Sequence, residues 1–243
     1  MRYGYVLLSV LLMMTRCSRQ DQANTLTAIE KSQGWQLLFD GESTNGWRGV
    51  NRQDVPAHWQ VRDGALVVNP PDIETTDKGD IITIEQYSDF ELKWEWKMIV
   101  PGSNSGVKYF VNEAWSNSGH GGVGLEYQLL DDADHEWMQS GEMQPNDYHT
   151  LASAYEIYPA SNKKVNPLGQ WNSSRIKVDG QLVEHWLNGV CVLSYDCGSE
   201  DFDLRVAQSK FHKYENFGHI GKGHILLQEH GSTVSFRNIK IKK

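Results

Sequence analysis

The sequence predicts an all-β protein built as a sandwich of two antiparallel sheets. Short segments that alternate between apolar and polar residues recur along the chain, and long helical periodicity is hard to find. Aromatic residues make up 11% of the chain, and its 22 glycines against 7 prolines favour short strands joined by glycine turns. Strands at this spacing, without helices between them, are typical of a two-sheet sandwich that forms one domain.

The predicted strands follow one another through the chain. FELKWEWKM at 90–98 alternates almost perfectly, so its two tryptophans are expected in the core. Asp-Gly or Asn-Gly pairs at 63–64, 179–180 and 188–189 are strong hairpin signals. The other expected strand segments are WQLLFD (35–40), HWQVRDGALVV (58–68), SGVKYFV (105–111), GLEYQLL (124–130), ASAYEIY (152–158), SRIKVDGQLVEHWLNGVCVLSY (174–195) and GHILLQEHGSTVSFRNIKIK (223–242).

The beginning of the chain is typical of an export signal, expected at residues 1–20. A basic start precedes an apolar run at 5–14 that is too short to cross a bilayer, and Cys17 stands where a bacterial lipoprotein would be cut and lipidated. The arginine before Cys17 departs from the small residue that this processing prefers, so secretion is favoured over lipid anchoring. We expect an exported protein, periplasmic or anchored at Cys17 to a bacterial outer membrane, with a polar tether at 21–33 and one folded domain at 34–243.

Charge and cysteine content narrow the class of partner. The formal net charge of −8 would repel a nucleic-acid backbone, so a neutral ligand such as a sugar is favoured. Cys191 and Cys197 would lie about 20 Å apart along one extended segment, beyond disulfide reach, and are expected to be unpaired. Because no histidine cluster is near them, a structural zinc site is not predicted.

The stretch GVGLEYQLLDDADHEW at 122–137 carries the candidate chemistry. Alternation places its leucines and tyrosine on one face of a strand and Glu126 and Gln128 on the other. A bulge near the end of this strand would bring Asp131 to the same face. Two carboxylates that flank an amide on a rigid sheet suit sugar chemistry. The alternative is a solvated outer face of an antiparallel sheet.

Five ordered segments resemble one known family. They are GWQLLFDGESTNGWRG, DFELKWEW followed by PGSNSGVKYF, GLEYQLLDD, WNSSRIKVDGQLVEHWLNGV, and GHILLQEHG with SFRNIKI. Together they look like the 3-keto-disaccharide hydrolase family, and the resemblance runs from about Gly34 to the C-terminus. It implies a concanavalin-like jelly roll, related in architecture to lectins and β-glucanases. It also implies catalysis on glycosides whose ring a partner sugar C3 dehydrogenase has first oxidised.

That implied substrate makes chemical sense of the polar strand. A ketone at C3 acidifies the C2 proton, so a base can remove it and the C1 substituent can leave, after which water can add. We assign Glu126 or Asp131 as base or acid, with Gln128 orienting a hydroxyl. Bulged β-glucanase motifs place an acid where this chain has Gln128, and the amide favours elimination over a double displacement.

Other side chains complete the expected site. His149 could donate a proton or bind a metal, and its alternative is a polar loop residue. Gln228 and His230 share strand parity and could line a concave face, Asn104 is expected to contact a hydroxyl, and Lys210 could stabilise an oxyanion. Further candidates for substrate contact are Lys108, the aromatic residues Trp115, Trp137 and Tyr158 in or beside loops, and Tyr155 and Trp186, which belong either to the core or to the cleft.

Two more histidine and carboxylate patterns need an interpretation. His185 shares the parity of core residues and is expected to be buried and hydrogen-bonded. A divalent metal would stabilise an enediolate, but the acidic residues at 131–135 match no calcium or zinc signature, so a metal stays unassigned.

Three function classes follow. The first is an enzyme that cleaves 3-keto glycosides by elimination or net hydrolysis, and the family resemblance favours it. The second is a conventional retaining β-glycosidase, which requires Glu126 and Asp131 at nucleophile distance. The third is a non-catalytic, lectin-like sugar-binding module, because this fold hosts such proteins. All three take a carbohydrate and none takes a nucleic acid.

Overall fold

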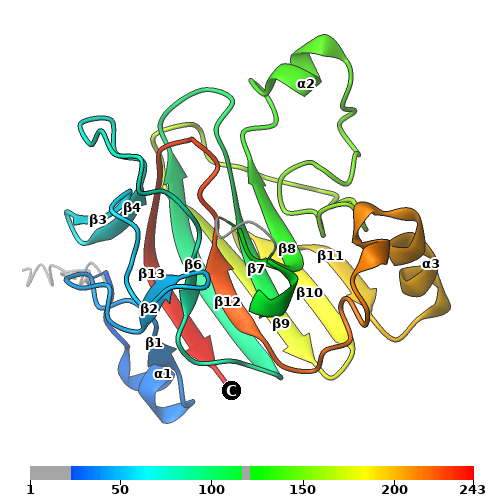
Figure 1. Ribbon diagram of the computed structural model, residues 1–243, viewed down its shortest axis with the longest axis horizontal. Helices are drawn as coiled ribbons and strands as arrows, with labels where there is room; N and C mark the ends of the chain where they lie inside the picture. Colours follow the sequence, from blue (N-terminus) through cyan, green and yellow to red (C-terminus); the bar gives the residue numbers. More distant parts are fainter. Residues whose placement is uncertain (1–22, 117–120) are drawn as a thin grey trace, which may run out of the picture.

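Two antiparallel sheets pack face to face in the computed structural model, which describes residues 23–116 and 121–243 (Figure 1). This arrangement confirms the predicted all-β jelly-roll sandwich. The expected export signal at 1–20, with Cys17, lies outside the described residues. None of the helices in the described ranges has the length and hydropathy that a membrane crossing requires.

The larger sheet has eight strands. Its order is β11-β10-β9-β6-β13-β4-β3, and β1 also pairs with β13. These strands are β1 (Gln36–Leu37), β3 (Trp59–Arg62), β4 (Ala65–Val68), β6 (Phe90–Met98), β9 (Asn172–Asp179), β10 (Leu182–Leu187), β11 (Val190–Asp196) and β13 (Val234–Lys242).

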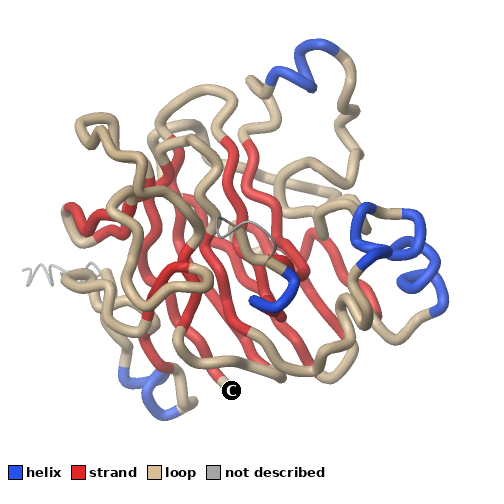
Figure 2. Tube along the Cα trace, in the orientation of Figure 1, coloured by secondary structure: helices blue, strands red, loops and turns tan. Residues whose placement is uncertain are grey.

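The smaller sheet has five strands in the order β2-β5-β12-β7-β8. They are β2 (Trp47–Gly49), β5 (Ile81–Thr83), β7 (Asn104–Asn112), β8 (Val123–Leu130) and β12 (His224–Leu227). The helices are α1 (Ala28–Ser32), α2 (Glu136–Ser140) and α3 (Glu200–Gln208), with 3-10 turns η1 (Glu113–Trp115) and η2 (Lys210–Lys213). Figure 2 shows the α-helices at the periphery of the two layers of strands.

The core forms because alternate residues of each strand face the space between the sheets. In β6 the apolar residues are buried and the charged residues between them are partly exposed, as the alternation predicted. In β8 the buried apolar residues include Tyr127, whose ring meets Trp94 of β6 edge-on with centroids 5.1 Å apart. The other face of β8 is therefore free to carry Glu126 and Gln128.

Hairpin turns occur where the sequence predicted them. The Asp-Gly pair at 63–64 has φ of 49° and 71°, and the Asn-Gly pair at 188–189 has φ of 47° and 80°. These left-handed pairs are what a two-residue hairpin turn of type I′ requires. The hairpin of β9 and β10 is also present, but Asp179 pairs with Leu182, so residues 180–181 form its turn.

Residues 152–158 form turns instead of the expected strand. Ala152 and Glu156 have φ of 64° and 69°, which an extended strand does not contain. Ala154 makes only isolated bridges, to Tyr127 and Tyr158. The sequence pattern also missed β5 and α3, because three residues are too few to show a period and α3 carries a weak apolar stripe with one buried residue.

The described part of the segment expected as a tether at 21–33 is packed against the larger sheet. Thr27 caps α1 in a reciprocal capping box with Glu30. The Glu30 carboxylate contacts the ammonium of Lys93 and lies 3.0 Å from that of Lys240. Burial raises the pKa of Glu30, but these hydrogen bonds outweigh it and lower the pKa to about 2. The tether expectation is wrong for this part of the chain.

Both described cysteines are free thiols, as expected. Cys191 on β11 is exposed, whereas Cys197, just beyond that strand, is buried. Burial raises the pKa of the Cys197 thiol to about 12, so this side chain is unreactive near neutral pH.

A buried histidine joins the two sheets. His185 of β10 is fully buried, its Nε2 lies 2.9 Å from the Tyr109 hydroxyl of β7, and its Nδ1 lies 2.8 Å from the carbonyl oxygen of Ala152. A carbonyl can only accept, so Nδ1 carries the proton and Nε2 accepts from Tyr109. The Tyr109 hydroxyl also bonds to that of Tyr195. Burial lowers the pKa of His185 to about 4, and the expectation of a buried, hydrogen-bonded histidine is confirmed.

Acid is expected to destabilise the fold through His185. Its pKa in the folded protein, about 4, lies below the ordinary value of 6.5, so its contribution to stability is present above pH 6.5 and is lost as the pH falls through 4. The loss is about 3 kcal/mol. In urea unfolding, the stability difference between wild type and His185→Gln should shrink by this amount between pH 7 and pH 4. A difference that does not change with pH would contradict the assignment.

Candidate active site

A cavity of about 230 Å³ opens on the outer face of the smaller sheet. Glu126 and Gln128 line it because Tyr127, the residue between them in β8, faces the core. The structure brings eight of the predicted site residues to this cavity, namely Asn104, Lys108, Glu126, Gln128, Tyr155, Lys210, Gln228 and His230. The residues of 122–124 and the η2 turn complete its walls.

A buried ion pair lies in the cavity floor. Lys108 of β7 and Glu126 of β8 are cross-strand partners, and Nζ of Lys108 lies 3.8 Å from Oε2 of Glu126. The same Nζ donates to the carbonyl oxygen of Gly122 at 3.1 Å. Burial acts to lower the pKa of Lys108, but the carboxylates of Glu126 and Asp80 outweigh it and raise the pKa above its ordinary value. Lys108 is therefore a fixed cation beside the Glu126 carboxylate.

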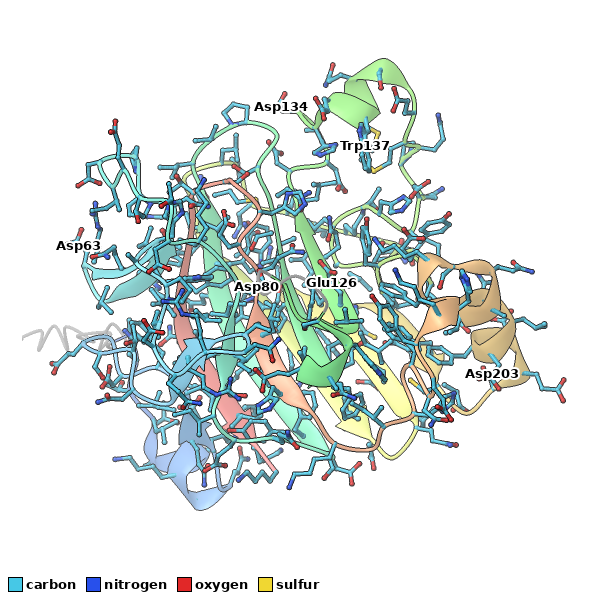
Figure 3. The ribbon with its side chains drawn as sticks, viewed as in Figure 1. Asp63, Asp80, Glu126, Asp134, Trp137 and Asp203 are labelled. Carbon is cyan, nitrogen blue, oxygen red and sulfur yellow. The ribbon has the colours of Figure 1, made fainter. Side chains whose placement is uncertain are left out.

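Asp80 is a second carboxylate near Lys108, and the sequence pattern did not identify it. It is 3% exposed and accepts hydrogen bonds from the backbone N–H groups of Glu229 at 2.8 Å and Gly122 at 3.2 Å. Figure 3 shows Asp80 and Glu126 near the middle of the molecule, over the smaller sheet. Burial raises the pKa of Asp80 to about 6, although Lys108 and the two backbone donors oppose it. Asp80 is thus ionised at neutral pH and gains a proton in mild acid.

Amide side chains lie beside the ion pair. Nε2 of Gln128 donates to Oδ1 of Asn104 at 3.2 Å. Gln228, directly after β12, is held by its backbone N–H, which donates to the carbonyl oxygen of Gly106 at 2.9 Å. Its side-chain Oε1 is buried and has no hydrogen-bond partner. Donors and acceptors gathered around a carboxylate and an ammonium suit a polyhydroxylated ligand.

One rim of the cavity is built by a chain of charged groups. Nζ of Lys210 lies 4.2 Å from the ring centre of Tyr155 and 3.4 Å from Oε1 of Glu156. The same Oε1 lies 3.3 Å from Nε2 of His149, whose Nδ1 lies 2.7 Å from Oδ1 of Asp147. His149 is therefore outside the cavity lining and linked to it through Glu156. Burial raises the pKa of Tyr155 to about 12, so its phenol keeps the proton.

Asp131 does not join Glu126 and Gln128, and this expectation is wrong. β8 pairs with β7 in regular register as far as Leu130, so no extra residue turns Asp131 to the cavity face. The irregularity of this pair lies at the other end, where Phe110 of β7 has φ of 53°. Oδ2 of Asp131 instead accepts a hydrogen bond from the backbone N–H of Gly102 at 2.9 Å.

Three predicted aromatic residues are also absent from the cavity lining. The ring of Trp115 packs on that of Phe217, with centroids 6.2 Å apart. The hydroxyl of Tyr158 donates to a carboxylate of α3 at 2.7 Å. Trp186 belongs to the larger sheet, and the guanidinium of Arg175 lies 4.0 Å from its ring centre. Of the aromatic candidates, Tyr155 lines the cavity and these three residues do not.

The acidic loop after β8 has structural roles. Asp132 accepts from the backbone N–H of Leu151 at 2.8 Å and pairs with Lys163 at 2.6 Å, and His135 caps α2. Figure 3 places Asp134 and Trp137, which lies on α2, in a projecting segment away from Glu126. Within residues 23–116 and 121–243, no three His, Cys, Asp or Glu side chains are grouped so that they could hold a metal ion.

Comparisons with known proteins agree with this geometry. The 3-keto-alpha-glucoside-1,2-lyase-like domain family matches residues 34–242. A Bacteroides thetaiotaomicron protein named 3-keto-disaccharide hydrolase is 32% identical over 230 residues, covering 86% of this chain and 78% of the relative. A crystal structure from Parabacteroides distasonis, provisionally named a glycosyl hydrolase, has a TM-score of 0.79 and 38% identity, covering 91% of this chain and 99% of that one. A second such structure from the same organism has a TM-score of 0.63 and 29% identity, with coverage of 86% and 98%.

The ionisation of Asp80 is expected to weaken the fold as the pH rises. Its folded-state pKa, about 6, lies above the ordinary value of 3.8, so its stabilising contribution is present below pH 3.8 and is lost as the pH rises through 6. An Asp80→Asn variant cannot ionise. Its stability relative to wild type should therefore improve by up to about 3 kcal/mol between pH 4 and pH 7. Chemical denaturation at both pH values tests this, and a constant difference would mean that Asp80 does not titrate in this range.

Proposed function

The chain belongs to the family of 3-keto-alpha-glucoside-1,2-lyase-like domains and is a glycoside-cleaving enzyme, and from this premise we propose that it acts on glycosides whose sugar ring carries a ketone at C3. The observation that supports this substrate is the Glu126 carboxylate, 3.8 Å from the Lys108 ammonium in the cavity floor. C2 and C3 of such a sugar are bonded neighbours. At this separation the carboxylate can remove the C2 proton while the ammonium stabilises the C3 oxygen.

The first step is removal of the C2 proton. Glu126 takes this proton, and the electron pair of the C2–H bond moves into a C2–C3 double bond, which leaves negative charge on the C3 oxygen. The Lys108 ammonium stabilises that oxygen without giving up its own proton, because the carboxylates of Glu126 and Asp80 raise its pKa. Burial strengthens this interaction, since little water screens it.

The second step breaks the glycosidic bond. The C3 carbonyl re-forms, the electron pair moves into a C1–C2 double bond, and the C1–O bond breaks. Tyr155 lines the cavity and stays protonated at neutral pH, so its phenol serves as proton donor to the leaving oxygen. Water that adds across the C1–C2 double bond converts the elimination into net hydrolysis.

A conventional retaining glycosidase fits this cavity less well. That chemistry needs two carboxyl groups about 5 to 5.5 Å apart on either side of C1. Among the described residues that line the cavity, Glu126 is the one carboxylate, and Gln128 and Gln228 are amides. Asp131 accepts a hydrogen bond from the backbone N–H of Gly102 outside the cavity. Asp80 is buried and accepts hydrogen bonds from backbone N–H groups.

The proposal implies a chemical context for the enzyme. Its substrate must be made by an oxidoreductase that converts the C3 hydroxyl of a glycoside to a ketone, so a sugar C3 dehydrogenase is the functional partner. We further propose that the protein is exported and works in the periplasm or at the outer membrane, on the basis of its first twenty residues.

The substrate proposal is tested with a 3-keto glucoside and its unoxidised parent. The enzyme should release the aglycone from the oxidised compound alone, because the parent has no acidic C2 proton. In heavy water, sugar recovered from partial reactions should carry deuterium at C2. Release from the parent without deuterium uptake would establish direct displacement at C1 instead.

The role of Glu126 is tested with a matched pair of variants. Glu126→Gln should lower kcat by roughly 10²- to 10⁴-fold, the usual contribution of a general base. Asp131→Asn makes the same chemical change five residues later, outside the cavity, and should leave kcat near the wild-type value. Steady-state assays on the 3-keto glucoside measure both. Equal losses in the two variants would show that the cavity assignment is mistaken.

A further inference from the structure

The carbonyl oxygen of the Gln228 side chain is a buried acceptor without a donor. Its Oε1 is shielded from solvent and makes no hydrogen bond. The backbone of Gln228 is fixed on β7, because its N–H donates to the carbonyl oxygen of Gly106 at 2.9 Å and its own carbonyl accepts from the Ser105 hydroxyl at 2.8 Å. A buried acceptor left unpaired costs free energy, so a fixed one inside a cavity indicates a group supplied by a ligand.

Gly106 makes room for the Glu126 carboxylate beside this oxygen. It lies inside β7, where glycine weakens a strand unless another group approaches the backbone closely. A methyl group on Gly106 would overlap Oε1 of Glu126 and would lie 3.2 Å from Oε1 of Gln228. Two acceptor oxygens from neighbouring strands therefore converge on the same point above the glycine.

We propose that Gly106, Glu126 and Gln228 form a seat for the C2 hydroxyl of the sugar, with that hydroxyl donating to Oε1 of Gln228. This inference rests on the proposed function, because it takes Glu126 as the base at C2. The hydroxyl and the hydrogen that Glu126 removes are bonded to the same carbon. An acceptor adjacent to the base is thus within reach of the C2 hydroxyl, and the missing side chain of Gly106 lets the Glu126 carboxylate lie beside that acceptor.

The seat makes the enzyme select sugars with a free C2 hydroxyl. A sugar that lacks this group, or carries a methyl ether on it, leaves Gln228 unpaired in the occupied cavity. Sites that hydrogen-bond a substrate hydroxyl reject analogues without it far more strongly than apolar pockets reject a missing methylene. Specificity at C2 would then come from one amide oxygen and one absent side chain.

Binding of unoxidised sugars tests the seat independently of turnover. Calorimetry with methyl α-glucoside and its 2-deoxy counterpart should show roughly tenfold tighter binding of the hydroxylated sugar to wild type. Gln228→Leu removes the acceptor, and the methyl group of Gly106→Ala displaces the Glu126 carboxylate from its place beside Gln228, so each should abolish this preference. Gln60→Leu makes the same amide-to-apolar change on β3 of the larger sheet and should retain it. Circular dichroism and thermal melting confirm that the variants are folded.

The outcomes separate the seat from the reaction. Equal binding of the two sugars to wild type, no binding of either, or a preference that survives in Gln228→Leu would overturn the seat. A second readout is the turnover of 3-keto glucosides with and without the C2 hydroxyl, each corrected for its uncatalysed rate. Wild type should favour the hydroxylated sugar, and Gln228→Leu should not. If neither 3-keto sugar is turned over, the proposed function fails, whatever the binding shows.

Discussion

A largely buried lysine that interacts with two carboxylates is the constraint on which the cavity depends. Lys108 is shielded in the floor of the smaller sheet, and a buried ammonium is tolerated only when opposite charges and acceptors surround it. Glu126 supplies one charge at 3.8 Å, Asp80 supplies a second, and the carbonyl oxygen of Gly122 accepts a hydrogen bond. Glu126 lies on β8 and Gly122 directly precedes it, whereas Asp80 directly precedes β5. One cation on β7 therefore links three parts of the chain around the cavity.

The sheet makes this arrangement rigid. Cross-strand pairing sets Lys108 opposite Glu126 and Gly106 opposite Gln128, so the spacing of the reactive groups is the spacing of neighbouring strands. The opposite faces of the same strands contribute to the core, including Tyr109 and its bond to His185 of the other sheet. A displacement of the cavity floor would therefore require repacking of the sandwich interior.

The alternation of side chains along a strand, which repeats every two residues, explains which part of the site was predictable from the sequence. It placed Glu126 and Gln128 on the polar face of a strand and Trp94 in the core, and both positions agree with the structure. It could not tell on which strand a bulge would occur, and the bulge near Phe110 instead of β8 is the reason that Asp131 lies elsewhere. Irregularities of this kind depend on tertiary packing and leave no periodic trace.

Other features depend on contacts between distant segments, which no local pattern encodes. Asp80 precedes a strand of three residues, which is too short to show a period. The sequence therefore did not predict which way the Asp80 side chain points, and the assembled sheet shows it. Residues 152–158 have strand-like composition, yet left-handed backbone at Ala152 and Glu156 bends them into the rim of the cavity. Trp186 is a residue type that often stacks on sugar rings, yet it lies on the other sheet, under the guanidinium of Arg175. In these cases the type of side chain indicated what the residue could do chemically, but it did not indicate where in the fold the residue lies.

The contact of Glu30 with two lysines sets a practical limit on how the protein can be shortened. The family match begins at residue 34, yet Lys93 and Lys240 are directly opposed on β6 and β13 and are neutralised by Glu30 from outside that match. Like charges facing each other across two strands repel. A recombinant product that starts at residue 34 would lack Glu30 and leave this repulsion uncompensated in the larger sheet. A shortened protein for expression or crystallisation should therefore keep Thr27, the residue that caps α1, and everything after it.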